Sequence, residues 1–271
     1  MQIENLTGCP IETLTIDSTF LERKVIVDVY FPVTKIDLNE CELLLINDGQ
    51  DLVPMDFANI LREVSDKITP LICVGIHCGA DRKNEYGTAN VLNDKGEGAK
   101  ALLYSRFILD ELIPLIKKEY KISSFKKKSF CGFSLGGLSA LDIVWNHPDE
   151  FSKVGIFSGS LWWRTVAQDD PEFSEEKHRI IHNEIKNGSY YPWLKFFFET
   201  GTLDENADRN NNGIIDSIDD TLALISELEK KGYHPETDIF YLQLKDGKHD
   251  VATWSHAFPT FLLWGWKKGQ G

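Results

Sequence analysis

Short apolar segments alternate with helical patterns along most of this chain. Seven segments are rich in β-branched and aromatic residues and are bounded by turn residues, which is typical of β-strands. Four longer patterns with helical periodicity lie between or after them. Because alternating strands and helices form a mostly parallel sheet covered by helices on both faces, the sequence predicts an α/β fold. The strand segments are residues 23–32, 42–47, 70–77, 128–133, 153–159, 194–201 and 238–245, and the helical patterns are residues 99–120, 135–151, 219–232 and 252–266.

Three local features refine this prediction. Valines alternate with polar residues in the segment 23–32, which suits an antiparallel strand at the edge of the sheet. Pro114 lies inside the helical pattern 99–120 and predicts a kink or a break there. Gly232 follows a helical pattern and is expected to end that helix as its C-cap.

Composition limits the kinds of protein this chain can be. Its 271 residues, of which 42% are hydrophobic, suffice for a single α/β domain spanning residues 1–271. The formal net charge of −13 argues against nucleic acid or an anionic membrane as a partner and leaves small molecules. No apolar run reaches the roughly 18 residues of a membrane span, and no secretory signal is visible, so we expect a cytoplasmic protein.

The cysteines favour free thiols. Their number is odd, and four of them lie in or beside apolar segments, which fits burial better than a disulfide framework. Their spacing does not match a zinc site, so we assign them no metal. They are Cys9, Cys41, Cys73, Cys78 and Cys131.

Residues 131–137 read CGFSLGG and place Ser134 between glycines, where a predicted strand meets a predicted helix. Gly-x-Ser-x-Gly at such a junction makes a strained bend that exposes the serine hydroxyl. An ordinary turn serine between glycines fits the same pattern. The chemical interpretation therefore needs a base within reach of the hydroxyl and a third group that orients the base.

His249 is the predicted base. In α/β hydrolases the serine, the acid and the histidine follow in that order along the chain. His249 comes after the last predicted strand and the turn KDGK, where a loop histidine can reach the sheet edge. We interpret His178 and His182, which lie in a polar stretch, and His234, which precedes a proline, as surface residues.

Asp204 is the predicted acid. It lies in the turn after the strand 194–201, which suits contact with a histidine on the next strand. Glu199, Glu205 and Asp208 remain alternatives, and aspartate is common in turns for its own reasons.

Backbone donors for an oxyanion are expected from two loops. The first is the N–H of Leu135, which follows the serine at the start of a helix whose dipole favours an anion. The second is the N–H of Gln50, in the glycine turn after the strand 42–47, with Asp51 as the alternative.

The run from Gly132 to Trp163, with LLLINDGQ before it and GKHDVATW after it, resembles the "Putative esterase" family of α/β hydrolases. It is particularly similar to the enterochelin (ferric enterobactin) esterase branch, which has relatives among feruloyl esterases, acetylxylan esterases and formylglutathione hydrolases. The resemblance spans roughly residues 20 to 268. It implies an α/β-hydrolase fold with Ser134 as nucleophile, His249 as general base and Asp204 at the position of the family's acid.

The resemblance also implies residues near the substrate. Trp162 and Trp163 match a position where relatives line an acyl or aromatic pocket, although core packing explains either one as well. Arg82 and Glu85, in HCGADRKNEYG, match an arginine and an acid that stabilise the surroundings of the active site. A salt bridge between these two is the simpler interpretation than contact with substrate.

Residues 208–219 have the spacing of a calcium loop. Oxygen-bearing side chains lie at positions 1, 3, 5, 9 and 12, and Gly213 lies at position 6, where the loop turns sharply. A helix follows the loop but a strand precedes it, so a hydrated acidic loop is the alternative. The calcium would be structural and would fix the turn that holds Asp204. The predicted ligands are Asp208, Asn210, Asn212, Ile214 and Asp219.

Together these features predict a serine carboxylesterase that needs no cofactor for catalysis and acts on a small-molecule ester. The ester would be siderophore-like or an acylated sugar. An acyltransferase or a thioesterase that resembles formylglutathione hydrolases would use the same residues, and a binding module without activity would use none of them. The sequence does not predict the oligomeric state.

Overall fold

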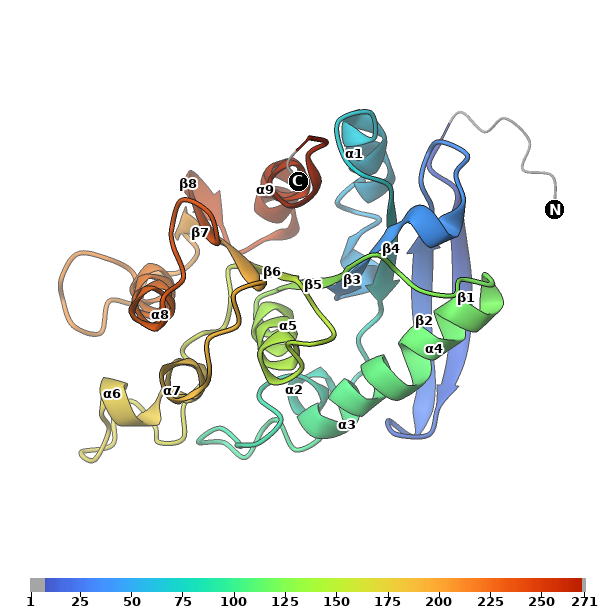
Figure 1. The fold of residues 1–271 in the computed structure, drawn as a ribbon. Helices are drawn as coiled ribbons and strands as arrows, with labels where there is room; N and C mark the ends of the chain where they lie inside the picture. The colour runs from blue at the N-terminus through green and yellow to red at the C-terminus, as the bar shows by residue number, and fades with distance from the viewer. Residues whose placement is uncertain (1–7, 270–271) are drawn as a thin grey trace.

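The computed structural model describes residues 8–269, in which the strands form one eight-stranded sheet (Figure 1). The strand order is β1-β2-β4-β3-β5-β6-β7-β8. All neighbouring pairs from β4 to β8 are parallel, whereas β2 is antiparallel to both β1 and β4. The predicted α/β class is confirmed. The strands are β1 (Ile11–Ser18), β2 (Arg23–Tyr30), β3 (Glu42–Asn47), β4 (Leu71–Ile76), β5 (Lys128–Phe133), β6 (Lys153–Phe157), β7 (Lys195–Leu203) and β8 (Ile239–Lys248).

The sequence prediction of strands is incomplete at one edge. All seven predicted strands are present, but β1 was not predicted, because its residues are mostly polar and its Ile11 is exposed. The prediction that 23–32 forms an antiparallel strand is confirmed, but its predicted position at the edge of the sheet is wrong. β1 pairs with β2 along its whole length, from Ile11 opposite Tyr30 to Ser18 opposite Arg23, and so takes the edge position.

Helices cover both faces of the sheet. α1 and α9 lie on one face, and α3, α4, α5, α7 and α8 lie on the other (Figure 1). Two apolar clusters fill the spaces between sheet and helices, and the cluster under α1 and α9 contains the stacked rings of Phe157 and Phe258. The helices are α1 (Phe57–Val64), α2 (Arg82–Glu85), α3 (Ala101–Arg106), α4 (Ile113–Glu119), α5 (Leu135–Asn146), α6 (Glu175–His178), α7 (Ile180–Asn187), α8 (Asp216–Lys231) and α9 (Val251–Trp266).

The two predicted helix irregularities are confirmed. Between α3 and α4 the backbone forms a π-helix over Phe107–Leu112, so the regular α-helical hydrogen bonding is interrupted just before Pro114, which lies in the first turn of α4. Gly232 ends α8 with φ = +114°, and its N–H donates to the last helical carbonyls.

The cysteines of the described chain are all free, as predicted, and Cys41, Cys73 and Cys131 are buried in or beside the central strands. None of the helices in residues 8–269 is both long and apolar enough to cross a membrane.

Candidate active site

Ser134 lies in a strained turn between β5 and α5. Its φ of +54° and ψ of −123° lie in a region that residues with a side chain rarely adopt. The Ser134 N–H donates to the carbonyl of Phe157 at 2.8 Å, which ties the turn to the end of β6. The N–H of Ser160 donates to the Ser134 carbonyl at 3.1 Å. The turn therefore holds the hydroxyl at the carboxyl end of the parallel strands.

The glycines on either side of Ser134 are required by close packing. A Cβ on Gly132 would lie 2.5 Å from the carbonyl carbon of Gly136. A Cβ on Gly136 would lie 2.5 Å from Oδ2 of Asp48, in the loop after β3. The two glycines of the Gly-x-Ser-x-Gly pattern thus lie where a side chain would collide, Gly132 with the backbone of Gly136 and Gly136 with the side chain of Asp48.

His249 lies between the end of β8 and the start of α9. Its ring meets the ring of Trp254 edge-on, with 5.3 Å between the ring centroids. His249 is exposed, but the surrounding protein partly desolvates its ring and lowers the pKa of His249, and the Asp204 carboxylate acts in the opposite direction. A lowered pKa favours the neutral imidazole, which is the form that a general base needs. Among the hydrogen bonds of residues 8–269, none joins His249 to Ser134 or to Asp204.

Asp204 lies in the turn that follows β7. Its Oδ2 accepts from the N–H of Gly201 at 3.1 Å, and its Oδ1 accepts from the hydroxyl of Ser158 at 3.1 Å. Burial raises the pKa of Asp204, and the Gly201 N–H acts in the opposite direction. His249, when protonated, also lowers the pKa of Asp204.

The alternative acids occupy different places. Glu199 is buried on β7, five residues before Asp204, and burial raises the pKa of Glu199 to about 8. Glu205 accepts from the N–H of Ser217 at the start of α8. Asp208 accepts from backbone N–H groups within its own loop.

The two predicted oxyanion donors are available. Within the described residues, the N–H groups of Leu135, at the start of α5, and of Gln50 donate to no protein acceptor. The N–H of Asp51 donates to the carbonyl of Asp48 at 2.9 Å, which removes the alternative donor. The Gln50 side chain accepts from the N–H of Cys78 at 3.1 Å and so fixes the loop after β3 against the loop after β4.

Arg82 and Glu85 do not form the predicted pair. Arg82 instead binds Asp48 through two hydrogen bonds of 2.7 Å, and Glu85 binds Arg23 of β2 at 2.7 and 2.6 Å. The prediction is wrong because the two side chains leave the short helix α2 toward different parts of the sheet. Arg82 and Glu85 are close in the sequence, and the prediction paired them for that reason. Their actual partners, Asp48 and Arg23, are distant in the sequence.

The two tryptophans differ in exposure. Trp163 is 1% exposed and packs against Gly87, so it belongs to the core and is not available to line a substrate pocket. Trp162 is partly exposed, with the Arg164 guanidinium 5.7 Å from its ring centroid. Of the predicted pair, only Trp162 is accessible to a ligand.

Two histidines interpreted as surface residues prove to be structural. His182 is 5% exposed, and its Nε2 is 2.9 Å from the carbonyl oxygen of Asp220. The correction arises because α7 packs on α8, which covers the face that His182 shares with apolar residues. His178 is partly buried and accepts from the N–H of Ser174.

The predicted calcium loop is closed by hydrogen bonds among its own residues. The amide groups of Asn210 and Asn212 both donate to Oδ2 of Asp219, at 2.9 and 2.8 Å. The Asp208 carboxylate accepts from the N–H groups of Asn212 and Gly213, and the latter has φ = +85°. No group of three or more His, Cys, Asp or Glu side chains in residues 8–269 is arranged to hold a metal. The predicted set supplies only two carboxylates, two asparagine amides and the Ile214 carbonyl.

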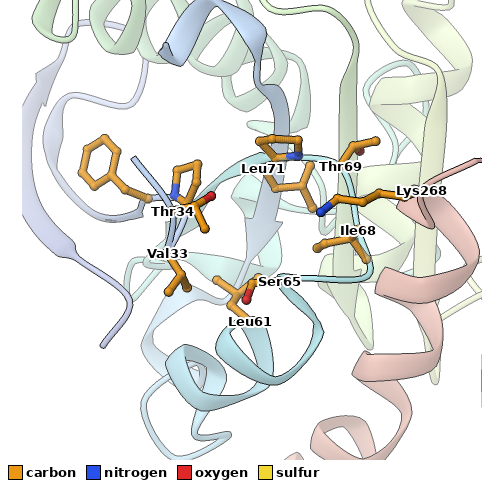
Figure 2. Close-up of a pocket in the computed structure, with 11 residues that line it drawn as sticks. Val33, Thr34, Leu61, Ser65, Ile68, Thr69, Leu71 and Lys268 are labelled. Carbon is orange, nitrogen blue, oxygen red and sulfur yellow. The ribbon is translucent and has the colours of Figure 1, made fainter. Parts of the chain in front are cut away.

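Two cavities formed by residues 8–269 lie away from Ser134. One, of about 50 Å³, is bounded by the residues that connect α1 to β4, the chain after β2 and Lys268 (Figure 2). A wider one, of about 540 Å³, is lined by the starts of β3, β6 and β7 and by the end of α9. Both lie where parallel strands begin, whereas Ser134, His249 and Asp204 lie where strands end. The candidate active site is therefore defined by its backbone geometry and hydrogen bonds.

Sequence reasoning missed two residues of the site. Ser158 contacts Asp204, and Asp48 holds Arg82. Ser158 lies in the segment FSGS that follows β6 and has φ = +44°, but a sequence does not reveal such a backbone conformation. Asp48 also has a positive φ, of 59°, next to the predicted oxyanion turn.

A mostly parallel sheet with helices on both faces and a strained serine turn at its carboxyl edge defines an α/β hydrolase. The chain belongs to the family described as "Putative esterase", whose model matches residues 18–264. Membership in this family makes the protein a carboxylic ester hydrolase by class.

Three relatives illustrate the similarity. The iron(III) enterobactin esterase of Escherichia coli is 26% identical over 162 residues, which are 59% of this chain and 35% of that protein. The enterobactin esterase of Shigella flexneri, crystallised in the presence of enterobactin, matches with a TM-score of 0.71 and 20% identity over 94% of this chain and 58% of its own. The siderophore hydrolase EstB of Aspergillus nidulans matches with a TM-score of 0.66 and 18% identity over 97% and 95%. The chain thus spans little more than half of the Shigella enzyme, and structural likeness at such identities establishes the fold.

Proposed function

We propose that the protein is a serine carboxylesterase in which Ser134 is the nucleophile, His249 the general base and Asp204 the acid. The observation that carries the proposal is the backbone of Ser134, which is held at φ = +54° between two tightly packed glycines. Such strain persists where the surrounding structure enforces it and is typical of functional sites. His249 and the half-buried Asp204 follow β8 and β7 and lie at the same edge of the sheet.

The reaction follows from these roles. His249 accepts the proton of the Ser134 hydroxyl while Oγ bonds to the ester carbonyl carbon. The N–H groups of Leu135 and Gln50 stabilise the oxyanion that forms. His249 then returns the proton to the leaving alkoxide as the ester C–O bond breaks. A water molecule, deprotonated by His249, cleaves the acyl-enzyme and restores Ser134.

Asp204 orients His249 and stabilises its charged form in this scheme. The hydrogen bonds that this role requires, from Ser134 to His249 and from His249 to Asp204, often shorten only when substrate binds. The electrostatic interaction between His249 and Asp204 supports this role for the acid.

The substrate is proposed to be an ester with an aromatic or catecholate acyl group, as in siderophores, with an acylated sugar as the alternative. The enterobactin esterases and EstB among the relatives support this class. The accessible ring of Trp162 would stack on the acyl group. Arg82, whose side chain is 31% exposed, would attract a negative group of the substrate.

Labelling with a fluorophosphonate tests the nucleophile without knowledge of the substrate. We expect labelling of the wild-type protein and none of the Ser134→Ala variant, with both folded by circular dichroism. The matched control is Ser160→Ala, whose hydroxyl lies 3.4 Å from that of Ser134 and is expected to be dispensable. Labelling that survives in Ser134→Ala, or absence of labelling in the wild type, would refute the proposal and favour a binding module.

A substrate panel then separates the remaining enzymes. It compares catecholate trilactone, feruloyl ester, acetyl ester and thioester substrates, each with and without an alcohol acceptor. Release of free acid identifies an esterase, and transfer to the alcohol identifies an acyltransferase. Preference for the thioester would indicate an enzyme similar to formylglutathione hydrolase.

We also propose that residues 208–219 bind a structural calcium ion. Their side chains already lie close together, because the amide N–H groups of Asn210 and Asn212 both donate to Asp219, and a bound ion would turn the amide oxygens inward. Asp216, at position 9, instead accepts from the N–H of Arg209, so it would stabilise the loop without contacting the ion directly. A bound ion would hold the carboxyl end of the loop at the start of α8.

A further inference from the structure

A second carboxyl group lies beside Asp204 at the acid end of the proposed site. Glu199 is on β7, five residues before Asp204, and the hydroxyl of Ser158 lies between the two. The Ser158 oxygen is 3.1 Å from Oδ1 of Asp204 and 3.5 Å from Oε2 of Glu199. Glu199 is 1% exposed, and its Oε1 has no hydrogen-bond partner within the described residues.

The number of protons decides how these groups are connected. Ser158 has one hydroxyl proton, and its oxygen already accepts from the indole N–H of Trp254 at 2.9 Å. The hydroxyl can donate to only one carboxyl group, and Asp204 is the closer. Contact with Glu199 is then favourable only if Glu199 is protonated and donates to the Ser158 oxygen. Burial, followed by the charge of Asp204, raises the pKa of Glu199 to about 8, which is consistent with this state.

The backbone fixes Ser158 in this place. Its φ of +44° is strained for a residue with a side chain, and its N–H donates to the carbonyl of Glu199 at 2.8 Å. The preceding residue, Phe157, accepts the N–H of Ser134. The Ser158 hydroxyl also anchors Trp254, whose ring contacts His249. Ser158 is thus linked to all three proposed catalytic residues. It contacts Asp204 directly, it reaches His249 through Trp254, and it follows Phe157, which binds Ser134.

We infer that Ser158 and a protonated Glu199 form a positioning unit that holds the Asp204 carboxylate, so that the acid end of the site carries one negative charge and not two. This inference rests on the proposed function, since it assigns a purpose to Asp204. When Glu199 ionises, one hydroxyl proton cannot satisfy two adjacent carboxylates, and their repulsion displaces Asp204 from His249. The reaction of Ser134 is therefore expected to slow as the pH rises through the pKa of Glu199.

Other groups around Glu199 have to be distinguished from it. The hydroxyl groups of Tyr241, on β8, and Thr200, on β7, share a hydrogen bond. The titratable residues Asp204, His249 and Asp250 follow β7 and β8. The charge of Arg82 also lowers the pKa of His249. A variant that changes only the ionisation of Glu199 isolates its effect from theirs.

Glu199→Gln is that variant, because glutamine has a similar shape, donates through its amide and stays neutral. The rate of fluorophosphonate labelling of Ser134 is measured from about pH 6 to about pH 10. We expect the wild-type rate to fall about fivefold or more above about pH 8 and the Glu199→Gln rate to stay level, with both rates within about twofold near pH 7. Glu205→Gln is the matched control, because it neutralises a neighbouring carboxyl that does not contact Ser158, and it should follow the wild type.

Ser158→Ala tests the other half of the unit. We expect its labelling rate to fall about tenfold at neutral pH, since Asp204 and Trp254 both lose their partner. If this variant does not fold, Glu199→Gln alone decides. A wild-type rate that does not fall at alkaline pH, or the same fall in Glu199→Gln as in the wild type, overturns the inference.

A stability measurement keeps this inference separate from the proposed function. Because the folded pKa of Glu199 lies above its unfolded value, this group contributes stability that is lost between about pH 5 and about pH 8. The melting temperature of Glu199→Gln should therefore gain on that of the wild type across this range, whether or not Ser134 reacts. If the difference in melting temperature between Glu199→Gln and the wild type does not change with pH, the positioning unit is overturned. If that difference grows with pH but Ser134 is not labelled, only the proposed esterase function is refuted.

Discussion

Ser134 combines a required side chain with an unfavourable backbone. Its φ and ψ place the Cβ where a side chain is disfavoured, and the bonds to Phe157 and Ser160 hold it there. The strain is compensated by the packing of β5, α5 and β6 around the turn. Activity and stability should therefore respond in opposite directions to a glycine at this position.

Ser134→Gly should be more stable than Ser134→Ala. Glycine adopts φ = +54° without a steric cost, which is worth about 1 kcal/mol and raises the melting temperature by about 2 to 4 °C in a chain of this size. Neither variant should react with a fluorophosphonate. Calorimetry of the two variants checks the order, and equal melting temperatures would show that the turn stores no strain.

Asp204→Asn should shift the acidic limb of the labelling rate to lower pH. Partial desolvation already lowers the pKa of His249, and the Asp204 carboxylate raises it in part, so removal of that charge lowers it further. Because labelling needs neutral His249, the rate of the wild type should decline below the ordinary histidine pKa of 6.5. Labelling rates measured across this range test the shift, and an unchanged limb would remove Asp204 from the site.

At the scale of secondary-structure elements, the sequence predicts residues marked by local pattern and chain order but not contacts between distant elements. The strand-to-helix junction at Ser134 and the loop after β8 were predicted, because glycine pattern and chain order mark them. The contacts of Arg82 with Asp48 and of Glu85 with Arg23 were not, because they depend on the strand order of the sheet, which local sequence does not encode. Ser158 was missed for a related reason, since its role depends on a backbone angle and on Glu199 of the neighbouring strand.

The loop 208–219 makes a separate prediction at this scale. Calcium at millimolar concentration should raise the melting temperature, and a chelator should reverse the rise, because the ion binds the folded state. Asp219→Ala should abolish the effect, since it removes the carboxylate to which both asparagines point. Asp246→Ala, at an exposed position of β8, is the control. If calcium does not change the melting temperature of the wild type, the calcium site is refuted and residues 208–219 form a hydrated loop.

At the scale of the whole molecule, the alternation of strands and helices was sufficient to predict the α/β class and seven of the eight strands. The antiparallel edge was misplaced because β1 carries too few apolar residues to be recognised. The two-layer core depends on α9, which covers one face with Phe258 and Phe261 and also begins two residues after His249. Loss of core packing in α9 should therefore affect both stability and the site.

Phe258→Ala should destabilise the protein by about 3 to 5 kcal/mol, because it removes a fully buried ring. That ring stacks on Phe157 with centroids 5.2 Å apart, and the carbonyl of Phe157 holds Ser134. Denaturation with urea measures the loss. Leu263→Ala, on a less buried face of the same helix, is the control and should cost clearly less.

The burial of the cysteines has a practical consequence for assays. Burial raises the pKa of Cys9, Cys41 and Cys78 to about 11, and Cys73 and Cys131 lie deeper still. Since only the thiolate reacts with disulfide dyes, the folded protein should consume almost no such reagent at neutral pH. Hydrolysis of a thioester can then be followed continuously through the colour of the released thiol, with the enzyme itself contributing no background.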